Sequence, residues 1–462
     1  MYPYLKRFKY TDPFLLAIEN DSMNLSVVGL GKLGLPLACC LAEAGHRVLG
    51  IDLEPVLVDK INRGECPLFE PQVQELVQKY HASTLQATTN ISQAVTQTDA
   101  TFILVATPSR ADGSFSNEFI EAALRSLGQC LRKNPKSYHL FIISSTVVPG
   151  STLTKFLPIL EAESGKKAGR DFGLAYDPDF VALGTVVHDF QNPDLVVLGA
   201  LDTRSGDMVE EIHKTICKSQ PKISRMGIQD AELAKVCLNA FITIKISFAN
   251  SIAQICEKIP GTNCDAVTKG IGADRRISPH YFTGGASFGG TCFPRDTVAL
   301  KKIAADLGLD APLMAAVEKI NKEMDLALAD RVQSFVPVGG RVGIIGLSFK
   351  DGTSVIAESN GIKLARILLE RGVRVTGYDP IAGGAAVDYF GPHFQIAQSL
   401  DDLMNECDVV AMMVRSPVFR NGIESFRKSK KLVIIDLWRF LDRSKLSPSL
   451  VYVPVGVGAP PA

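Results

Sequence analysis

The sequence predicts an α/β fold in which two Rossmann-like, doubly wound parallel-sheet domains are joined by a long central helix. Three observations lead to this prediction. Buried-strand patterns alternate with helical segments in the first third of the chain and again in the last quarter, and such alternation implies parallel strands with right-handed crossovers. Between them, residues 229–258 form one continuous helical pattern. The length of 462 residues also exceeds what one ordinary core accommodates.

The first alternating segment begins with a strand pattern at residues 25–29 (LSVVG). A helical run follows, with Gly45 as its expected C-terminal glycine, and then a strand at 46–52 (HRVLGID) that ends in an acid. Further strand patterns lie at 100–106 (ATFILVA) and 140–144 (LFIIS). Their apolar, turn-bounded runs are typical of strands buried on both faces.

The predicted central helix ends at Pro260 and Gly261, which break helices. Its apolar positions recur at steps of three and four residues: Leu233, Cys237, Phe241, Ile244, Phe248 and Ile252. A helix of about 30 residues spans roughly 45 Å. That length suits a bridge between two domains or a dimer interface.

The second alternating segment starts with a strand pattern at 341–346 (RVGIIG) and a helix near 361–371. A strand ending at 378–380 (YDP) follows, and the runs 408–413 (DVVAMM) and 432–436 (LVIID) predict two more. We expect residues 454–462 (PVGVGAPPA) to form a loose tail, since chain ends are ordered only where contacts hold them.

These patterns predict four segments. Residues 1–22 are an N-terminal extension and 23–225 a Rossmann domain. Residues 226–330 hold the central helix, a cysteine-containing loop and a region for dimerisation, and 331–462 form the C-terminal domain.

Composition excludes several functional classes. Lys plus Arg and Asp plus Glu both number 49, and this zero balance argues against proteins that coat nucleic acid or an acidic membrane surface. The sequence contains no uninterrupted run of about 18 apolar residues, so no transmembrane helix is predicted. The first residues lack the regions of a signal peptide. We therefore expect a cytoplasmic enzyme without nucleic-acid or membrane partners.

The ten cysteines are irregularly spaced and form no CxxC motif. In a chain of this kind, reduced thiols that act as small apolar side chains are the simplest expectation. Most of them lie within apolar helical or strand patterns, and nine of the ten fit this expectation. Cys292 does not, and no metal site is predicted.

A glycine-rich motif after the first strand indicates a dinucleotide site. The motif runs Gly29, Leu30, Gly31, Lys32, Leu33 and Gly34. It follows a strand, opens a helix, and precedes Asp52, which lies 18 residues beyond its last glycine. In this context the glycines let a pyrophosphate approach the helix N-terminus. Asp52 suits ribose hydroxyls and repels a 2′-phosphate, so NAD is favoured over NADP.

The segment 284–296 (GGASFGGTCFPRD) contains four glycines within seven residues. Such a run disfavours a core position and favours a backbone that approaches a ligand. Cys292 lies three residues before a cation and four before a carboxylate, as expected of a tuned nucleophile. From spacing alone, a structural cysteine in a glycine-rich turn remains an equal alternative.

The chain resembles the UDP-glucose/GDP-mannose 6-dehydrogenase family through many motifs in family order. They include GLGKLGLPLA at 29–38, NRGECPLFEP at 62–71, ATPS at 106–109, SSTVVPGST at 144–152, GTVVHDFQNPDLVVLG at 184–199, GLSFKDGT at 346–353 and GYDP at 377–380. The segment around Cys292 is similar to the family signature GGSCFPKD. The resemblance implies an N-terminal NAD domain, a C-terminal nucleotide-sugar domain, a long connecting helix, and a homodimer or higher homo-oligomer.

The resemblance also implies a four-electron oxidation of a sugar C6 alcohol to a carboxylate, with reduction of two NAD. Cys292 would trap the aldehyde as a thiohemiacetal and carry the later thioester. The other catalytic positions that match are Lys235, Asn239, Asp296, Thr146 and Asp179. Without the resemblance, Lys235 would be interpreted as a surface lysine on an amphipathic helix.

The remaining family positions concern ligands. Thr107 and Pro108 match cofactor positions. Phe180, Phe288, Gly289 and Lys350 match substrate positions, and Arg276 matches an arginine that reaches the substrate of the partner subunit. Outside the family, the charged positions would be solvated charges.

Several positions depart from the family pattern. Asp179 replaces a glutamate credited with assisting thioester hydrolysis, and Leu183 replaces a second glutamate of the UDP-glucose enzymes. In the motif TSVIAES, Ser354, Val355 and Ala357 stand for Asp, Asp and Arg. Arg295 replaces the usual lysine. These changes concern substrate and hydrolysis, so we expect an active dehydrogenase with an altered sugar, nucleotide or rate, suited to a polysaccharide or natural-product pathway.

Three functions therefore follow from the sequence. The first is oxidation of UDP-glucose to UDP-glucuronate. The second is oxidation of an N-acetylated UDP-sugar or of GDP-mannose. The third is a catalytically impaired protein that binds NAD and a nucleotide sugar, against which the presence of Cys292, Lys235, Asn239 and Asp296 argues.

Overall fold

The computed structural model describes residues 22–134, 138–427 and 431–459. All but the last residue of the expected N-terminal extension lies outside these ranges. The chain divides into two compact units. The first comprises Met1–Thr107 and Asn117–Glu232, and the second Pro108–Ser116 and Leu233–Ala462. The predicted α/β class with two sheets and a connecting helix is confirmed.

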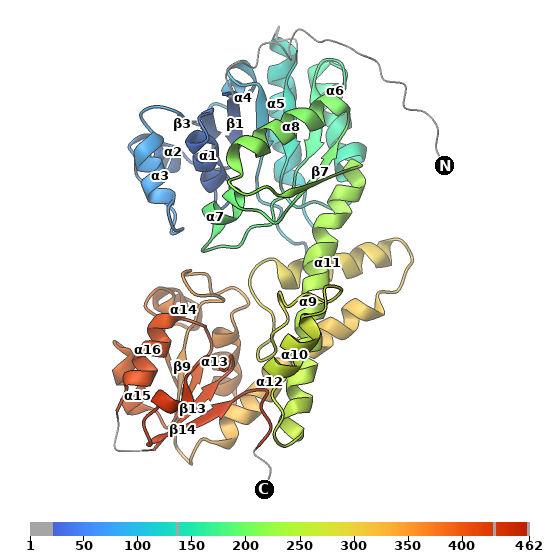
Figure 1. Ribbon diagram of the computed structural model, residues 1–462. Helices are drawn as coiled ribbons and strands as arrows, with labels where there is room; N and C mark the ends of the chain where they lie inside the picture. Colours follow the sequence, from blue (N-terminus) through green and yellow to red (C-terminus); the bar gives the residue numbers. More distant parts are fainter. Residues whose placement is uncertain (1–21, 135–137, 428–430, 460–462) are drawn as a thin grey trace. The chain divides into compact units, whose positions relative to one another are not determined.

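The first unit contains an eight-stranded sheet in the order β3-β2-β1-β4-β5-β6-β7-β8. Its strands are β1 Asn24–Val28, β2 Arg47–Ile51, β3 Leu85–Thr88, β4 Ala100–Ile103, β5 Leu140–Ile143, β6 Gly173–Tyr176, β7 Leu195–Ala200 and β8 Lys222–Met226. Its helices are α1 Gly34–Glu43, α2 Pro55–Asn62, α3 Val73–Tyr80, α4 Ser92–Thr96, α5 Glu118–Lys133, α6 Leu157–Ser164, α7 Val186–Gln191 and α8 Thr203–Ile216, with a π-helical turn at Thr152–Phe156. Helix α1 contacts α3, α7 and α8, whereas α5 contacts α4 and α6. Figure 1 shows these helices around the sheet.

The sheet is parallel except at one pair, because β7 runs antiparallel to β6. The four strands with long apolar runs, β1, β2, β4 and β5, were predicted. The other four strands were not predicted. In β8 the reason is that its sequence KISRM forms a half-exposed edge strand with no buried residue. A period-two or continuous apolar signal needs a buried face.

Helix α9, Ile228–Lys258, joins the two sheets as one uninterrupted helix (Figure 1). Its predicted extent is confirmed, but its buried face is not the predicted apolar stripe. Phe241 and Phe248 are 61% and 50% exposed. The buried face instead carries small and polar side chains, among them Glu232, Lys235 and Asn239. The apolar stripe thus remains on the surface of the single chain.

The second unit contains a six-stranded, fully parallel sheet in the order β11-β10-β9-β12-β13-β14. Its strands are β9 Arg341–Ile345, β10 Arg374–Tyr378, β11 Gln395–Ile396, β12 Val409–Met412, β13 Leu432–Asp436 and β14 Leu450–Pro454. Its helices after α9 are α10 Cys264–Gly272, α11 Phe293–Asp306, α12 Pro312–Ser334, α13 Asn360–Glu370, α14 Gly383–Phe390, α15 Leu400–Glu406 and α16 Pro417–Ser425, with a 3-10 turn at Arg443–Lys445. Side-chain caps explain two of the helix starts. Ser359 accepts from Gly361 N–H at α13, and Ser399 accepts from Asp402 N–H at α15.

The expectation of a loose tail at 454–462 was wrong for the residues that the structure describes there. Pro454 ends β14, and Val457 forms a β-bridge with Asn263. The Gly456 carbonyl accepts from Cys264 N–H at 2.9 Å, and Gly458 N–H donates to Thr262 at 2.9 Å. These backbone bonds supply the contacts that order a chain end. Residues 460–462 lie outside the described ranges.

Candidate active site

The glycine motif turns sharply between β1 and α1. Gly29 has φ +94° and its N–H donates to Ile51 O at 2.8 Å. A Cβ added at Gly34 would lie 1.8 Å from Gly29 O, so α1 can pack on the turn only with glycine there. The Asp52 carboxylate accepts from Leu30 N–H at 2.8 Å and from Glu54 N–H at 3.1 Å. These bonds fix the carboxylate at the end of β2.

Gly31 is the residue of this motif that points to a ligand. A Cβ added there meets nothing within 4 Å, so packing within the chain does not require a glycine. Gly31 and Lys32 are exposed, and the first turn of α1 carries no acidic residue. An open glycine at the N-terminus of a helix whose first turn carries no acidic residue fits a dinucleotide pyrophosphate. Thr107 is buried and Pro108 exposed in the segment after β4.

Thr146 and Asp179 leave the ends of neighbouring strands. In the parallel pair β5 and β6, Ile143 lies opposite Tyr176. Thr146 and Asp179 each follow three residues later, and both are half-buried. The register therefore brings a hydroxyl and a carboxyl to the same edge of the first sheet, where ligands of open α/β sheets bind.

Asp177 lies two residues before Asp179 and is buried. Its two carboxylate oxygens lie 3.0 and 2.9 Å from Nε2 of His213 on α8. Burial disfavours the charged ring, but the Asp177 carboxylate outweighs this and raises the pKa of His213 from 6.5 to about 10. A charge-assisted pair thus holds the start of the Asp179 loop.

The second unit contains a cluster around Cys292, which immediately precedes α11. Asp296 lies one turn later, and its N–H donates to Cys292 O at 2.8 Å. Asn239 on α9 donates to Asp296 Oδ2 at 2.6 Å, and Arg295 Nε donates to Asp296 Oδ1 at 2.9 Å. Asp296 is fully buried. The carboxylate is therefore paired and fixed between two helices, as a buried charge requires.

Lys235 is buried on α9, one turn before Asn239. Side chains four residues apart share a helix face, so the ammonium and the Asn239 amide lie on the same side of α9. The alternative of a solvated surface lysine is excluded by this burial. The bond from Asn239 to Asp296 joins α9, which carries Lys235, to α11, which begins directly after Cys292.

Cys292 is the one exposed cysteine of the ten, and all ten are free thiols. The other nine are buried or half-buried, as expected. Burial raises the pKa of the Cys40 thiol to about 12 and that of Cys264 to about 11, and these thiols therefore stay protonated and unreactive. Cys292 is the residue directly before the first turn of α11.

The glycine-rich segment before Cys292 was expected to avoid the core, and this was wrong. Residues 284–288 and 290 are buried. A Cβ at Gly284 would lie 2.3 Å from Ala249 O, one at Gly285 2.1 Å from Leu437 O, and one at Gly289 2.1 Å from Glu358 O. The glycines are needed because backbone of the same unit packs directly against them.

The predicted substrate residues differ in exposure. Phe288 is buried, Phe180, Gly289 and Lys350 are half-buried, and the Arg276 side chain is 82% exposed. Arg276 pairs with Asp274 at 2.7 Å. Lys350 follows β9 at the carboxyl edge of the second sheet. The structure thus distributes these residues over both units: Phe180 belongs to the first and the others to the second.

Sequence reasoning assigned no role to Asp379, although GYDP was noted as a motif. Asp379 at the end of β10 accepts from Leu347 and Ser348 N–H at 2.9 and 3.0 Å. Asp52 does the same for Leu30 at the end of β2. The sequence signal that could have identified Asp379 is the order strand, glycine, helix, strand and aspartate, which both domains share. It marks the carboxyl edge of β9 and β10 as a second ligand-binding turn.

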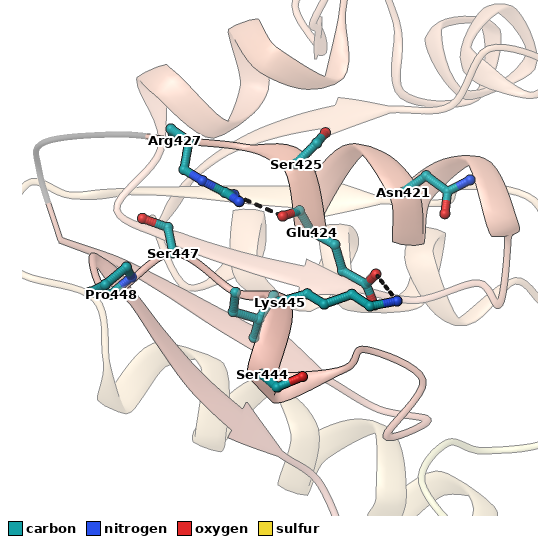
Figure 2. A pocket seen from close by; sticks show the side chains of 9 residues that line it. Asn421, Glu424, Ser425, Arg427, Ser444, Lys445, Ser447 and Pro448 are labelled. Carbon is teal, nitrogen blue, oxygen red and sulfur yellow. Dashed lines mark hydrogen bonds and ion pairs between the residues drawn. The ribbon is translucent and has the colours of Figure 1, made fainter.

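Two cavities lie apart from the predicted site residues. Figure 2 shows one of 490 Å³, lined by α16 and the segment before β14, where Arg427 donates to the Glu424 backbone and Lys445 pairs with the Glu424 carboxylate. It opens at the amino ends of β13 and β14, opposite the edge where ligands of such sheets bind. The other, of 1510 Å³, is lined by the end of α9, α12 and the C-terminal segment.

Two further properties of the described residues bear on function. In the part of the chain that the structure describes, no group of His, Cys, Asp or Glu side chains is arranged to hold a metal ion. Helix α9 is long and apolar enough to cross a membrane. However, buried Glu232, Lys235, Asn239 and Asn250 lie along it, which is typical of a core helix.

Family models cover most of the chain. Residues 23–217 match the NAD binding domain of the UDP-glucose/GDP-mannose dehydrogenase family, residues 229–323 its central domain and residues 343–443 its UDP binding domain. The predicted NAD site and nucleotide-sugar domain therefore correspond to matched domains.

Individual relatives agree in length as well as sequence. A UDP-glucose 6-dehydrogenase of Haloferax volcanii is 35% identical over 91% of this chain and 98% of its own. A GDP-mannose 6-dehydrogenase of Pseudomonas syringae pv. tomato is 34% identical over 91% of this chain and 97% of its own. The solved UDP-glucose dehydrogenase of Pyrobaculum islandicum superposes with a TM-score of 0.85 at 32% identity, covering 94% of this chain and 98% of that one.

Proposed function

The chain belongs to the UDP-glucose/GDP-mannose dehydrogenase family and is an NAD-dependent nucleotide-sugar 6-dehydrogenase, and from this premise we propose that it oxidises UDP-glucose to UDP-glucuronate through a thioester on Cys292. The observation that carries the proposal is the setting of Cys292. It is the exposed cysteine, at the start of α11, one turn before a buried Asp296 that Asn239 holds.

Bound NAD⁺ supplies the hydride acceptor for two successive oxidations at C6, so one turnover consumes two NAD⁺ and one water. Gly31 and Lys32 would face its pyrophosphate and Asp52 its adenosine ribose. Thr107 and Pro108 follow β4 on the same sheet and complete this set.

Lys235 and Asn239 stabilise the oxygen on C6. In the first oxidation the alcohol passes its proton to a water held by Asp296 as the hydride leaves, and the Lys235 ammonium favours the alkoxide that develops. The Cys292 thiol then adds to the aldehyde carbon, and its proton passes to the same oxygen, which becomes the thiohemiacetal hydroxyl. Because Asn239 lies one turn from Lys235 on the same helix face, both can address that oxygen.

The second hydride leaves the thiohemiacetal, and the product is a thioester on Cys292. Water attacks its carbonyl carbon, the C–S bond breaks, and the sugar leaves as a carboxylate with the thiol restored. Asp296, Thr146 and Asp179 are the groups that we assign to positioning this water and accepting its proton. Asp179 is shorter than glutamate by about 1.5 Å, so we expect hydrolysis to be the slow step.

We further propose a cytoplasmic homodimer. Arg276 is exposed and would then meet the substrate of the partner subunit, and the exposed stripe of α9 would be covered by the second copy. Phe180, Phe288, Gly289 and Lys350 are the proposed substrate residues within each chain.

The test measures NADH released per sugar consumed, using UDP-glucose, UDP-GlcNAc, UDP-ManNAc and GDP-mannose. UDP-glucose should give the highest kcat/KM and two NADH per sugar. Preference for GDP-mannose or for an N-acetylated sugar would replace the substrate part of the proposal, since relatives of both nucleotide types are about equally similar.

Cys292→Ser tests the covalent part, with Cys130→Ser on α5 as the control cysteine. Cys292→Ser should abolish release of the second NADH, while Cys130→Ser should leave the stoichiometry at two. Unchanged turnover in Cys292→Ser would overturn the thioester mechanism, and a wild-type yield of one NADH would overturn full oxidation.

A further inference from the structure

The backbone of residues 284–290, which we name the glycine loop, is held by the side-chain amides of three asparagines. The first is Asn250 on α9, which is fully buried. Its Nδ2 donates to Ala286 O at 2.8 Å, and its Oδ1 accepts from Gly285 N–H at 2.8 Å. One amide thus satisfies a donor and an acceptor of adjacent residues in the loop.

The second asparagine bonds both backbone groups of a single residue further along the loop. Asn321 on α12 accepts from Phe288 N–H at 2.7 Å and donates to Phe288 O at 3.1 Å. Asn321 is buried, as is Phe288. Both hydrogen bonds therefore form away from water, where an unmet backbone group is costly.

The third asparagine holds the residue between those two sites. Asn360, in the first turn of α13, donates to Ser287 O at 2.9 Å, and its Oδ1 lies 2.5 Å from Ser287 Oγ. Ser287 Oγ also lies 2.5 Å from Asp325 Oδ1 on α12. The loop is thus fixed from three helices, α9, α12 and α13.

An asparagine is required at such a position because one planar group must donate and accept at once. A carboxylate offers no proton to a carbonyl oxygen, and an apolar side chain of the same size offers neither partner. The glycines complete the arrangement, since Gly285 and Gly289 pack directly on the backbone of Leu437 and Glu358. The loop is therefore rigid before any ligand binds.

We propose that Asn250, Asn321 and Asn360 are positioning residues that hold the glycine loop, and through it Phe288, Gly289 and the thiol of Cys292, in the geometry that the sugar requires. This inference rests on the proposed function, since it assigns the loop to the substrate and Cys292 to the nucleophile. The three asparagines themselves need not touch substrate. Their effect is exerted through the backbone four to seven residues before Cys292.

The test compares Asn321→Asp with Asn62→Asp. Asn62 at the end of α2 makes the same two bonds to one residue, accepting from Ala87 N–H at 2.8 Å and donating to Ala87 O at 2.9 Å. It belongs to the first unit and is more exposed. For each variant we would measure kcat and KM for the preferred sugar, the rate of Cys292 alkylation by iodoacetamide, the Kd for NAD and the melting temperature.

Asn321→Asp should lower kcat/KM by about 10- to 100-fold, the effect expected of a misplacement near 1 Å. Its alkylation rate should also change, while its Kd for NAD stays at the wild-type value. Asn62→Asp should leave kcat/KM, the alkylation rate and the Kd for NAD at their wild-type values. Asn360→Asp, at a half-buried position, should reproduce the effect if Asn321→Asp does not fold.

A folded Asn321→Asp or Asn360→Asp with wild-type kcat/KM and alkylation rate would overturn the inference, as would a loss that Asn62→Asp matches. Failure of the proposed function can be told apart from failure of this inference, because the proposed function is tested by the NADH yield of the wild type and of Cys292→Ser. A wild-type yield of one NADH per sugar, or unchanged turnover in Cys292→Ser, would remove the premise. Two NADH per sugar from the wild type together with silent asparagine variants would remove the inference alone.

Discussion

The carboxyl groups around the end of β6 differ in what surrounds them, and this difference determines what each can do. Asp177 is buried and paired with His213. Asp179 is half-buried two residues later and follows the same strand. The ion pair therefore holds the backbone just before Asp179, the carboxyl that we assign to hydrolysis. How far that carboxyl reaches then depends on the length of its side chain.

Asp179→Glu should accelerate thioester hydrolysis by restoring the missing methylene. We expect a larger steady-state kcat, up to about 10- to 100-fold if reach is what limits hydrolysis, with little change in the first burst of NADH. Stopped-flow absorbance of NADH separates burst from steady state. A lower kcat in Asp179→Glu would contradict this assignment and indicate that the site is shaped for aspartate.

The pair of His213 with Asp177 predicts a pH dependence of stability. Its folded-state pKa, raised to about 10, means that folded His213 keeps its proton where the unfolded ring has lost it. The folded state then binds more protons, so this contribution is complete below about pH 6.5 and is lost as pH rises through about 10. The side chain of Cys217 also hydrogen-bonds the ring and acts in the same direction.

The double variant His213→Gln with Asp177→Asn should lack this dependence, because both partners are neutral. Urea midpoints at pH 6.5, 8 and 9.5 should fall for the wild type and fall less for the double variant. Parallel curves for the two proteins would show that the pair does not govern stability in this range.

At the level of whole elements, α9 has two faces with different chemistry. The buried face carries Lys235, Asn239 and Asn250, which hold the site and the glycine loop. The opposite face keeps Phe241 and Phe248 exposed. Exposed aromatic side chains in a continuous helical stripe are typical of an interface.

Phe241→Glu combined with Ile255→Glu should convert a dimer to a monomer, because each places a charge in an apolar contact. Ile255 is 53% exposed on the same helix. Leu307→Glu, at an exposed leucine after α11, is the control and should remain dimeric. Sedimentation equilibrium measures the mass, and a monomeric wild type would refute the predicted dimer.

At the level of the whole molecule, the two sheets repeat one local device. Gly29 and Gly346 both have φ near +90°, and a Cβ at Gly34 or Gly361 would strike the carbonyl of the respective glycine. Asp52 and Asp379 then hold the turn through backbone N–H groups. The chain thus uses the same turn for the cofactor domain and for the domain that matches nucleotide binding.

NAD should stabilise the protein more than NADP, since Asp52 repels a 2′-phosphate. At a concentration 100 times its Kd, NAD should raise the free energy of unfolding by about 2.7 kcal/mol. Asp52→Asn should narrow the gap between the two cofactors. Thermal unfolding with each cofactor measures this, and equal shifts in the wild type would contradict the assignment of Asp52.

The sequence by itself determined the fold class, the extent of α9 and the NAD turn, because each carries a local signal: an apolar run, a helix without breakers or a glycine motif. Cys292 as the nucleophile stays a prediction that a family signature carries. Only the tertiary structure decided which face of α9 is buried, since its small and polar buried residues give no apolar period. It also decided that the glycine loop lies in the core and that residues 456–458 are bonded to the segment 262–264. The place of the glycine loop depends on backbone groups of Ala249, Leu437 and Glu358 and on the amides of three distant asparagines. No local pattern in the loop itself encodes such partners.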